Sequence, residues 1–339
     1  IKANLKNFLS QQDEFRDYDF EGSGMAVLLD ILAYNTHYLG FNANMLANEM
    51  FLDSADLRAS VVSKAKAVGY TPISSTAAQA VIDVTVNNAV GSSLTMVRGT
   101  QFSTTVDGTS YNFVTNADLS ITPVDGVYKF SNVDIFEGTY LNFKYTVNTS
   151  DIDQRFIIPN DNVDTNTLTV KVQESSSDST TNTYTLATGI TGLDSTSKVF
   201  FLQEVENGRY EVTFGDGVLG KAVADGNIII TDYINTNTTQ ANSATTFTLN
   251  GSIGGFSNAT VTTVNDAGGG SLPESIQSIK YNAPRDYTAQ DRAVTADDYK
   301  VLVKTLYANA QAVQVYGGED AAIPDYGKVY ISIKAKSGS

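Results

Sequence analysis

Hydrophobic and polar positions change their spacing twice along the chain. In residues 1–75, apolar side chains recur three or four positions apart, which is the spacing of an amphipathic helix. The members of this stripe are Met25, Leu28, Leu29, Leu32, Leu39 and Phe41. We expect the helix to begin at Gly22-Ser23-Gly24 and Gly40 to divide it in two.

A further helix is predicted before the pattern changes. Ser54 or Asp53 suits its N-cap, Gly69 suits the position after its last turn, and Pro72 prevents its continuation. Its apolar stripe consists of Leu57, Val61, Val62, Ala65 and Val68.

From about Thr76, apolar and polar residues alternate, as they do in strands with one buried face. Dipeptides that suit tight turns separate these runs. They lie at 87–88, 107–108, 125–126, 207–208 and 225–226. The Ser/Thr-rich residues 174–182 predict an exposed hairpin tip, and the polar residues 235–246 predict a link to the next region.

The last part of the chain mixes both patterns. Pro273 and Glu274 suit the first turn of a helix that Ala283-Pro284 should end. Residues 295–298 read as a capping box that opens a second helix through about Tyr307. Tyr299, Leu302, Val303 and Leu306 would form its apolar face. Strands are predicted at 312–316 and 328–334.

These patterns predict an α+β multidomain protein. We expect a helical N-terminal region at 1–75, an antiparallel β-rich middle domain at 76–248, a linker at 249–271 and a small α+β C-terminal module at 272–339. A length of 339 residues suits two or three domains. The chain starts with Ile1, so we also expect it to be part of a longer protein.

The charge balance argues against nucleic acid as a partner. With 37 acidic against 22 basic side chains, the net charge is −15, whereas phosphate binding needs a basic face. We therefore expect no nucleic acid partner. We also expect no membrane insertion, because the richest apolar stretch, residues 25–34, is short and contains Asp30.

Candidate catalytic chemistry is sparse. The glycines and Asp216 in residues 214–220 could suggest a phosphate or cation loop, but strand residues flank the motif, so a strand connection is the better interpretation. Residues 161–166 lack the Gly and Glu of a calcium loop and predict a turn. His37 is the sole histidine, and Cys is absent. We predict no catalytic, cofactor-binding or metal-binding residues and a protein that is not an enzyme; a two-carboxylate glycan hydrolase is the enzymatic alternative.

The remaining conspicuous residues suit structural turns or contacts with a partner protein. The predicted structural turns are Gly99, Gly138, Gly215, Asp216, Gly217, Gly220, Gly269 and Gly270. Two arginines flank the predicted helix junction, where they could form local ion pairs or contact a partner protein. The possible partner contacts are Arg285, Arg292, Asp298, Tyr299 and Leu302.

The order of these segments resembles the baseplate J-like family, the wedge proteins of contractile phage tails and related injection machines. The resemblance covers about Thr76 to the end and rests on residues 96–102, 136–139, 214–220, 269–275, 283–284 and 292–299. Residues 17–23 and the helix after them resemble the longer wedge subunits of complex baseplates.

The resemblance implies a structural protein of the virion, located in the tail baseplate and synthesised in the host cytoplasm. Its implied partners are a second copy of itself, other baseplate wedge subunits, the sheath initiator and the central hub. It would link wedges into a ring that relays the trigger for sheath contraction, with the N-terminal helices and the C-terminal module as contact patches. The alternative from composition is a secreted or surface β-rich adhesin or a tail-associated glycan-binding protein.

Overall fold

The computed structural model describes residues 1–16, 18–87, 89–187, 189, 192–289, 292–307, 310–321 and 323–335. Asp17 and Asn88, which belong to motifs named above, lie outside this part of the chain. The chain divides into two compact units, residues 1–64 and residues 65–339, and each is described by itself.

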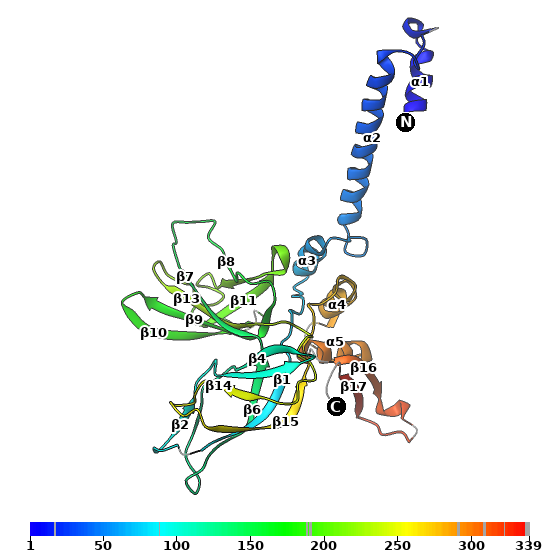
Figure 1. Cartoon of the computed structure of the whole chain (residues 1–339). Helices are drawn as coiled ribbons and strands as arrows, with labels where there is room; N and C mark the ends of the chain where they lie inside the picture. Colours follow the sequence, from blue (N-terminus) through cyan, green and yellow to red (C-terminus); the bar gives the residue numbers. More distant parts are fainter. Residues whose placement is uncertain are drawn as a thin grey trace. The chain divides into compact units, whose positions relative to one another are not determined.

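The first unit is helical (Figure 1). It contains α1 (Lys2–Ser10), the 3-10 turn η1 (Asp13–Phe15) and α2 (Gly24–Glu49). An ion pair of 2.5 Å between Lys2 and Asp30 joins α1 to α2. The predicted break at Gly40 is wrong, because α2 runs through it; one glycine costs a helix only about 1 kcal/mol relative to alanine.

The helix α3 (Arg58–Ala67) begins later than predicted. The Ser54 hydroxyl donates to the backbone oxygen of Asn48 at 2.6 Å, and the Glu49 carboxylate accepts from the backbone N–H of Asp56 at 2.9 Å, so residues 54–56 are tied back to the end of α2 before α3 begins. The predicted end is confirmed, because Gly69 has a φ of +84°.

A six-stranded antiparallel sheet forms the first half of the β region. Its order is β14-β3-β4-β6-β1-β15. Its members are β1 (Gln79–Val86), β3 (Gln101–Val106), β4 (Thr109–Thr115), β6 (Tyr128–Glu137), β14 (Thr248–Asn250) and β15 (Ala259–Gly268). The short strands β2 (Leu94–Met96) and β5 (Leu119–Ile121) pair with each other. Alternate residues of β1 are buried and pack with Phe102, Phe113 and Phe130.

Residues 249–271 are therefore not a linker, contrary to the prediction. The strand β15 pairs along β1, with Val84 opposite Val261, so the cyan and yellow strands lie side by side in Figure 1. Its alternation is carried by Ala259 and Val261 among threonines, and this weak apolar signal hides the strand in the sequence.

The second half is a seven-stranded sheet in the order β7-β13-β9-β10-β11-β12-β8. Its members are β7 (Thr139–Thr146), β8 (Phe156–Ile157), β9 (Val163–Ser175), β10 (Asp178–Leu186), β11 (Val199–Glu204), β12 (Tyr210–Phe214) and β13 (Ile228–Asn235). The 3-10 turn η2 (Glu206–Gly208) joins β11 to β12. All pairs are antiparallel except β10 with β11. The ring of Tyr145 on β7 meets Phe156 on β8, so the sheet curls until its two edges approach.

Two turn predictions have different outcomes here. Residues 175–178 form the tip of the β9–β10 hairpin, inside the predicted stretch 174–182, but residues 179–182 belong to β10. Residues 163–166 belong to β9, so the turn predicted over 161–166 is wrong for most of its length. The short polar side chains of this stretch are typical of a turn, but Val163 and Asp164 are buried and belong to the sheet.

The second sheet is inserted into the first. The chain leaves the six-stranded sheet at the end of β6, builds all seven strands of the other sheet, and returns through residues 236–247 to β14. Residues 236–247 are more than a polar link, because Ala241, Ala244 and Phe247 are buried in the core of the six-stranded sheet.

The C-terminal module contains α4 (Ile276–Ala289), α5 (Ala296–Leu306), β16 (Ala310–Gly317), the turn η3 (Gly318–Asp320) and β17 (Val329–Ala335). The predicted end of α4 at Pro284 is wrong. Buried Asn282, Ala283 and Ala289 hold the helix on both sides of the proline, and this packing outweighs one missing hydrogen bond. The capping box of Thr295 and Asp298 is confirmed. The predicted helical N-terminal region, β-rich middle and small α+β module are thus all present.

Candidate functional site: a polar joint between two sheets and the exposed surfaces

The first crossing between the sheets is made by Glu137 and Gly138. The fully buried Glu137 carboxylate accepts from the Thr236 hydroxyl at 2.7 Å, the Asn237 backbone N–H at 2.9 Å and the Asn237 side-chain amide at 2.6 Å. Gly138 has a φ of +128°, and a Cβ there would lie 2.3 Å from the backbone oxygen of Asn235. The outgoing and returning segments are therefore joined by buried hydrogen bonds.

Gly270, which follows Gly269, contacts the same returning segment. Gly269 has a φ of +84°, and a Cβ on Gly270 would lie 2.2 Å from the backbone oxygen of Thr238. The Asn242 side chain accepts from the Gly270 N–H and donates to the Gly270 oxygen, both at 3.0 Å. Gly270 permits backbone to approach backbone, which a side chain would prevent, and Gly269 adopts the positive φ that favours glycine.

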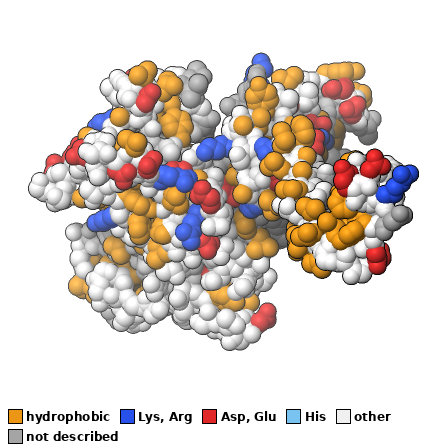
Figure 2. Space-filling view, turned by 90° about the horizontal axis from the view of Figure 1, so that it is seen from above, with side chains coloured by type: hydrophobic (Ala, Val, Ile, Leu, Met, Phe, Trp, Pro, Cys, Tyr) orange, Lys and Arg blue, Asp and Glu red, His pale blue; other side chains and the backbone are white. Residues whose placement is uncertain are grey.

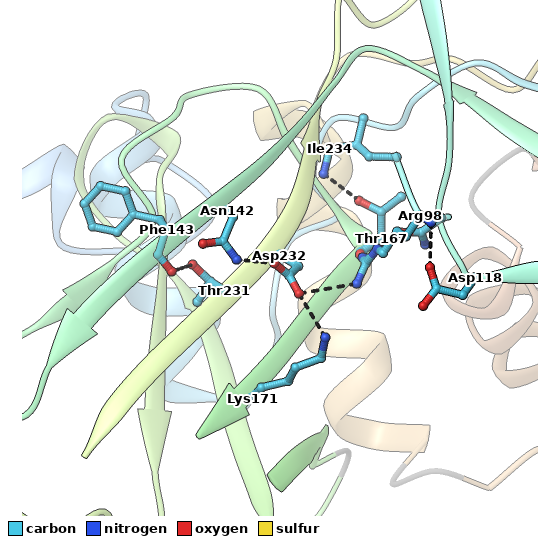
Figure 3. Close-up of polar contacts among 10 residues, drawn as sticks. Arg98, Asp118, Asn142, Phe143, Thr167, Lys171, Thr231, Asp232 and Ile234 are labelled. Atoms are coloured by element: carbon cyan, nitrogen blue, oxygen red, sulfur yellow. Dashed lines mark hydrogen bonds and ion pairs between the residues drawn. The ribbon is translucent and has the colours of Figure 1, made fainter. Parts of the chain in front are cut away.

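Arg98 makes a second tie between the sheets (Figure 3). It precedes β3, yet its Nη2 donates to the backbone oxygen of Thr167 on β9 at 3.1 Å, and its Nη1 lies 3.6 Å from Asp232 on β13. Its guanidinium carbon lies 5.0 Å from the centre of the Tyr140 ring. A Cβ on Gly99 would lie 3.2 Å from that ring, so Gly99 lets the loop settle on Tyr140.

Asp232 is the anionic centre of this joint. Lys171 contacts it at 3.2 Å, and the Asn142 amide donates to it. Burial acts to raise the pKa of Asp232, but hydrogen bonds from Asn142, Tyr140 and Lys171 and the charge of Lys171 hold it below its usual range. Burial, then the charge of Asp232, raises the pKa of Tyr140 to about 12. At pH 7, Asp232 is therefore ionised and the Tyr140 phenol is neutral.

Asp164 ties the start of the first sheet to β9. Its buried carboxylate accepts from the Ala77 N–H at 2.9 Å and from the Asn166 N–H at 3.0 Å. Burial raises its pKa despite these hydrogen bonds. Asp164 and Asp232 were missed from the sequence. An acid at a position that the strand alternation would bury, as in Thr231-Asp232-Tyr233, is the signal that could have identified them.

The motif at 214–220 forms a rigid turn after β12. The Asp216 carboxylate accepts from the backbone N–H of Val218 and Leu219, both at 2.9 Å, and these bonds lower its pKa. Gly217 and Gly220 have φ of +89° and +95°. A Cβ on Gly215 would lie 2.4 Å from the Gly220 backbone, so the turn is backbone architecture.

The structure places the predicted partner contacts on different parts of the C-terminal module. The Arg285 guanidinium lies 3.6 Å from the centre of the Tyr281 ring and donates to the Tyr281 oxygen at 2.7 Å. Hydrogen bonds from Thr295, then the charge of Arg292, contribute to a lowered pKa of Asp298, whose carboxylate belongs to the capping box.

The apolar face predicted for α5 is only partly correct. Val301 is buried, whereas Tyr299 and Leu302 are half-buried and Leu306 is 85% exposed. Tyr299 and Leu302 therefore contribute to the packing of the module as well as to its surface.

Hydrophobic side chains gather at the surface of the chain in several groups (Figure 2). In the first unit, the largest such surface belongs to α2, where one stripe has the 4-3-4-3-4 spacing of a coiled-coil seam. Its exposed members are Val27, Ile31, Tyr34, Tyr38, Phe41 and Met45. A second stripe beside it contains Leu28, Leu32, Leu39 and Leu46.

His37 is exposed on α2, with its ring 6.0 Å from that of Tyr38. Within the described ranges, no group of three or more acidic or histidine side chains is arranged to hold a metal ion. None of the described helices is both long and apolar enough to span a membrane.

Comparison with known proteins gives matches at both ends of the chain. Residues 1–70 match the helical domain of gp6-like baseplate wedge proteins, and residues 295–339 match C-terminal domain I of the baseplate structural protein gp6. The chain is also 32% identical over 369 aligned residues to the baseplate wedge protein gp6 of Enterobacteria phage T4. That alignment covers 100% of this chain and 54% of the relative, so the chain spans about half the relative's length.

The matches are to gp6-type baseplate wedge proteins. The resemblance to the baseplate J-like family therefore stays a prediction. The similarity to a structural baseplate protein points to a non-enzymatic role and supports a location in the virion, at the tail baseplate. Over its whole length the chain is similar to the gp6 baseplate wedge protein of phage T4, and its two ends are similar to gp6-type domains.

Proposed function

We propose that this protein is a structural subunit of the baseplate wedge that pairs with a second copy of itself and joins neighbouring wedge subunits through α2. The observation that carries the proposal is the seam of exposed apolar residues along that helix. Side chains such as Ile31 and Phe41 are 58% exposed, although each would bury a large apolar area against another helix.

The spacing of the seam identifies the kind of contact. A 3.5-residue repeat keeps one face of a helix against a partner helix over its whole length. Because a second apolar stripe lies beside the first, each α2 has surface for two helices. We assign one to the second copy of this chain and the other to a different wedge subunit.

A ring of wedges needs a further contact, and we place it on the C-terminal module. Leu306 and Val294 are 85% and 78% exposed there, and Arg285 is held against Tyr281 with donors remaining for a partner's carboxylate. In this arrangement the trigger for contraction passes between α2 at one contact and the module at the other, with the sheath initiator and the hub as the outer partners.

The test is the assembly state of a charge variant of the seam. Phe41→Glu with Met45→Glu places two charges in the seam and should convert dimers to monomers in analytical ultracentrifugation. It should also remove this chain from complexes isolated after co-expression with the other wedge subunits.

The matched control is Asn44→Glu with Ala47→Glu. Both residues are exposed and lie on the opposite face of the same helix turns, so the control adds the same charge outside both stripes. Dimers that persist in the seam variant, or that are lost equally in the control, would refute pairing through this seam.

A further inference from the structure

The outer edge of β17 has no partner strand in the described part of the chain. β17 pairs with β16 alone (Figure 1), so the backbone N–H and C=O groups on its other side face no neighbouring strand. Six of its seven residues, 329–335, are exposed. A two-stranded sheet is marginally stable by itself, and an exposed apolar edge strand is a template for pairing with another chain.

The apolar face of this hairpin is covered over β16 and open over β17. Val315 on β16 is buried, whereas Ile331, directly opposite it on β17, is 43% exposed. Val313 is half-buried, and its partner Ile333 is 45% exposed. Because α5 packs against β16, its cover ends between the two strands. The free edge therefore carries an uncovered row of apolar side chains.

We propose that β17 pairs antiparallel with β17 of a second copy of this chain, about a two-fold axis at Ser332, so that two hairpins form one four-stranded sheet. Ser332 is the middle residue of the strand, so this register pairs all seven residues of each copy. Ile331 then lies opposite Ile333 of the second copy, on the same face of the sheet. The apolar row of one copy continues into that of the other.

The charges of the strand favour this register. Lys334 is the sole charged residue of β17, and it would lie opposite Tyr330 of the second copy, whose ring face attracts an ammonium group. An axis at Ile331 would instead place Lys334 opposite Lys328, and like charges directly opposite each other are destabilising. A slip of one residue would turn the two apolar faces to opposite sides of the sheet.

The dimensions of the combined sheet explain why a second copy fits this edge. The β16 strands of the two copies would lie three strand spacings apart, which is about 14 Å. A helix with its side chains is about 10–12 Å wide. Two α5 helices, each on its own β16, would therefore cover the apolar rows of both β17 strands between them. A lone strand of another protein would pair with the edge but leave these rows in water.

The contact is small and is separate from the pairing proposed for α2. Stable interfaces bury about 1,200–2,000 Å², and one added strand pair falls at the low end of that range or below it. We therefore expect the β17 pair to be weaker than the α2 pair and to form when the chain is concentrated. A covalent trap suits such a contact better than sedimentation does.

The test uses single cysteines, because the chain contains none. Ser332→Cys would place two thiols opposite each other with Cα atoms about 4.5–5.5 Å apart, within the reach of a disulfide. Gln314→Cys is the matched control, since Gln314 is exposed and lies directly opposite Ser332 on β16, but its two copies would be about 14 Å apart. With oxidised glutathione, we expect disulfide dimers of the Ser332 variant and none of the control on non-reducing gels.

A second pair of variants reports the register. Tyr330→Cys mixed with Lys334→Cys should form a mixed disulfide, whereas neither variant should dimerise by itself, because each position lies four residues, about 14 Å, from its own copy. All variants carry Phe41→Glu and Met45→Glu, so pairing through α2 does not contribute. Melting temperatures equal to that of the parent would show that the variants remain folded.

Several results would overturn the proposal. Equal dimer formation by the Gln314 variant would show random collision. The absence of a disulfide at position 332 in the purified chain would leave the edge to a strand of another protein. Dimers that form only when the α2 seam is intact would show that β17 has no pairing of its own. A failure of the α2 proposal, seen as a monomer in ultracentrifugation, would leave the result at position 332 unchanged.

Discussion

Replacing Glu137 by leucine should cost more stability than any single surface contact in the molecule. Its carboxylate is the acceptor for the Thr236 hydroxyl and for two N–H groups of Asn237. Leucine has a similar volume but no acceptor, so the donors remain while their partner is lost.

The loss of stability in Glu137→Leu depends on which of the three donors water can reach. Thr236 is 2% exposed and its hydroxyl would be stranded, whereas the Asn237 side chain is exposed and can be hydrated. The Asn237 backbone N–H lies between these cases. At about 1–3 kcal/mol for each stranded donor, we expect Glu137→Leu to lose about 2–4 kcal/mol. Glu137→Gln retains one acceptor and should lose about half of that.

The assay is hydrogen exchange followed by mass spectrometry, with urea unfolding alongside it. Two nested sheets need not unfold in one step, so a local measurement is more direct than a single midpoint. Peptides that cover residues 236–247 should exchange faster in Glu137→Leu. Glu206→Leu, at an exposed acid, is the control and should leave both measurements close to the wild type. Unchanged exchange of residues 236–247 in Glu137→Leu would refute the role of this carboxylate.

Two further predictions concern the same joint. Gly138→Ala should lose about 3 kcal/mol or misfold because its Cβ meets a backbone oxygen, whereas Gly108→Ala, at a φ of +80° in open space, should lose only about 1–2 kcal/mol. Thermal melting compares the two, and equal losses would contradict the steric argument. Asp164→Asn should lose stability at pH 4, because the amide nitrogen would face one of the two backbone N–H groups that the carboxylate accepts. The loss should shrink as pH rises, because burial raises the pKa of the acid in the folded state and the wild type loses stability as pH rises through that range. Urea midpoints at pH 4 and pH 8 test this, and a loss that grows with rising pH would refute it.

The sequence predicted the local elements well because local chemistry determines them. The capping box of Thr295 and Asp298, the end of α3 at Gly69 and the alternation in β1 each depend on residues within a few positions. The predictions failed at Gly40 and Pro284, which are both inside helices. A single glycine costs too little to end α2, and at Pro284 the packing of buried neighbours outweighs the local preference.

The joint itself could not be predicted, because it depends on strand order. Arg98 and Asp232 are far apart in the chain and meet only because the second sheet is inserted into the first. Neither propensity nor periodicity carries information about which distant strands become neighbours. The glycines of the joint were identified as turns, but the backbone that each one approaches was not.

The arrangement of the joint limits how the two sheets can move. Glu137, Gly138 and Gly270 all close on residues 235–238, and Arg98 reaches Asp232 just before them. A rotation of one sheet against the other would therefore break several buried hydrogen bonds and an ion pair together, because close-packed contacts do not deform continuously. Each broken contact would expose or strand a polar group, so the cost rises with the first small displacement. We infer that the two sheets move as one body.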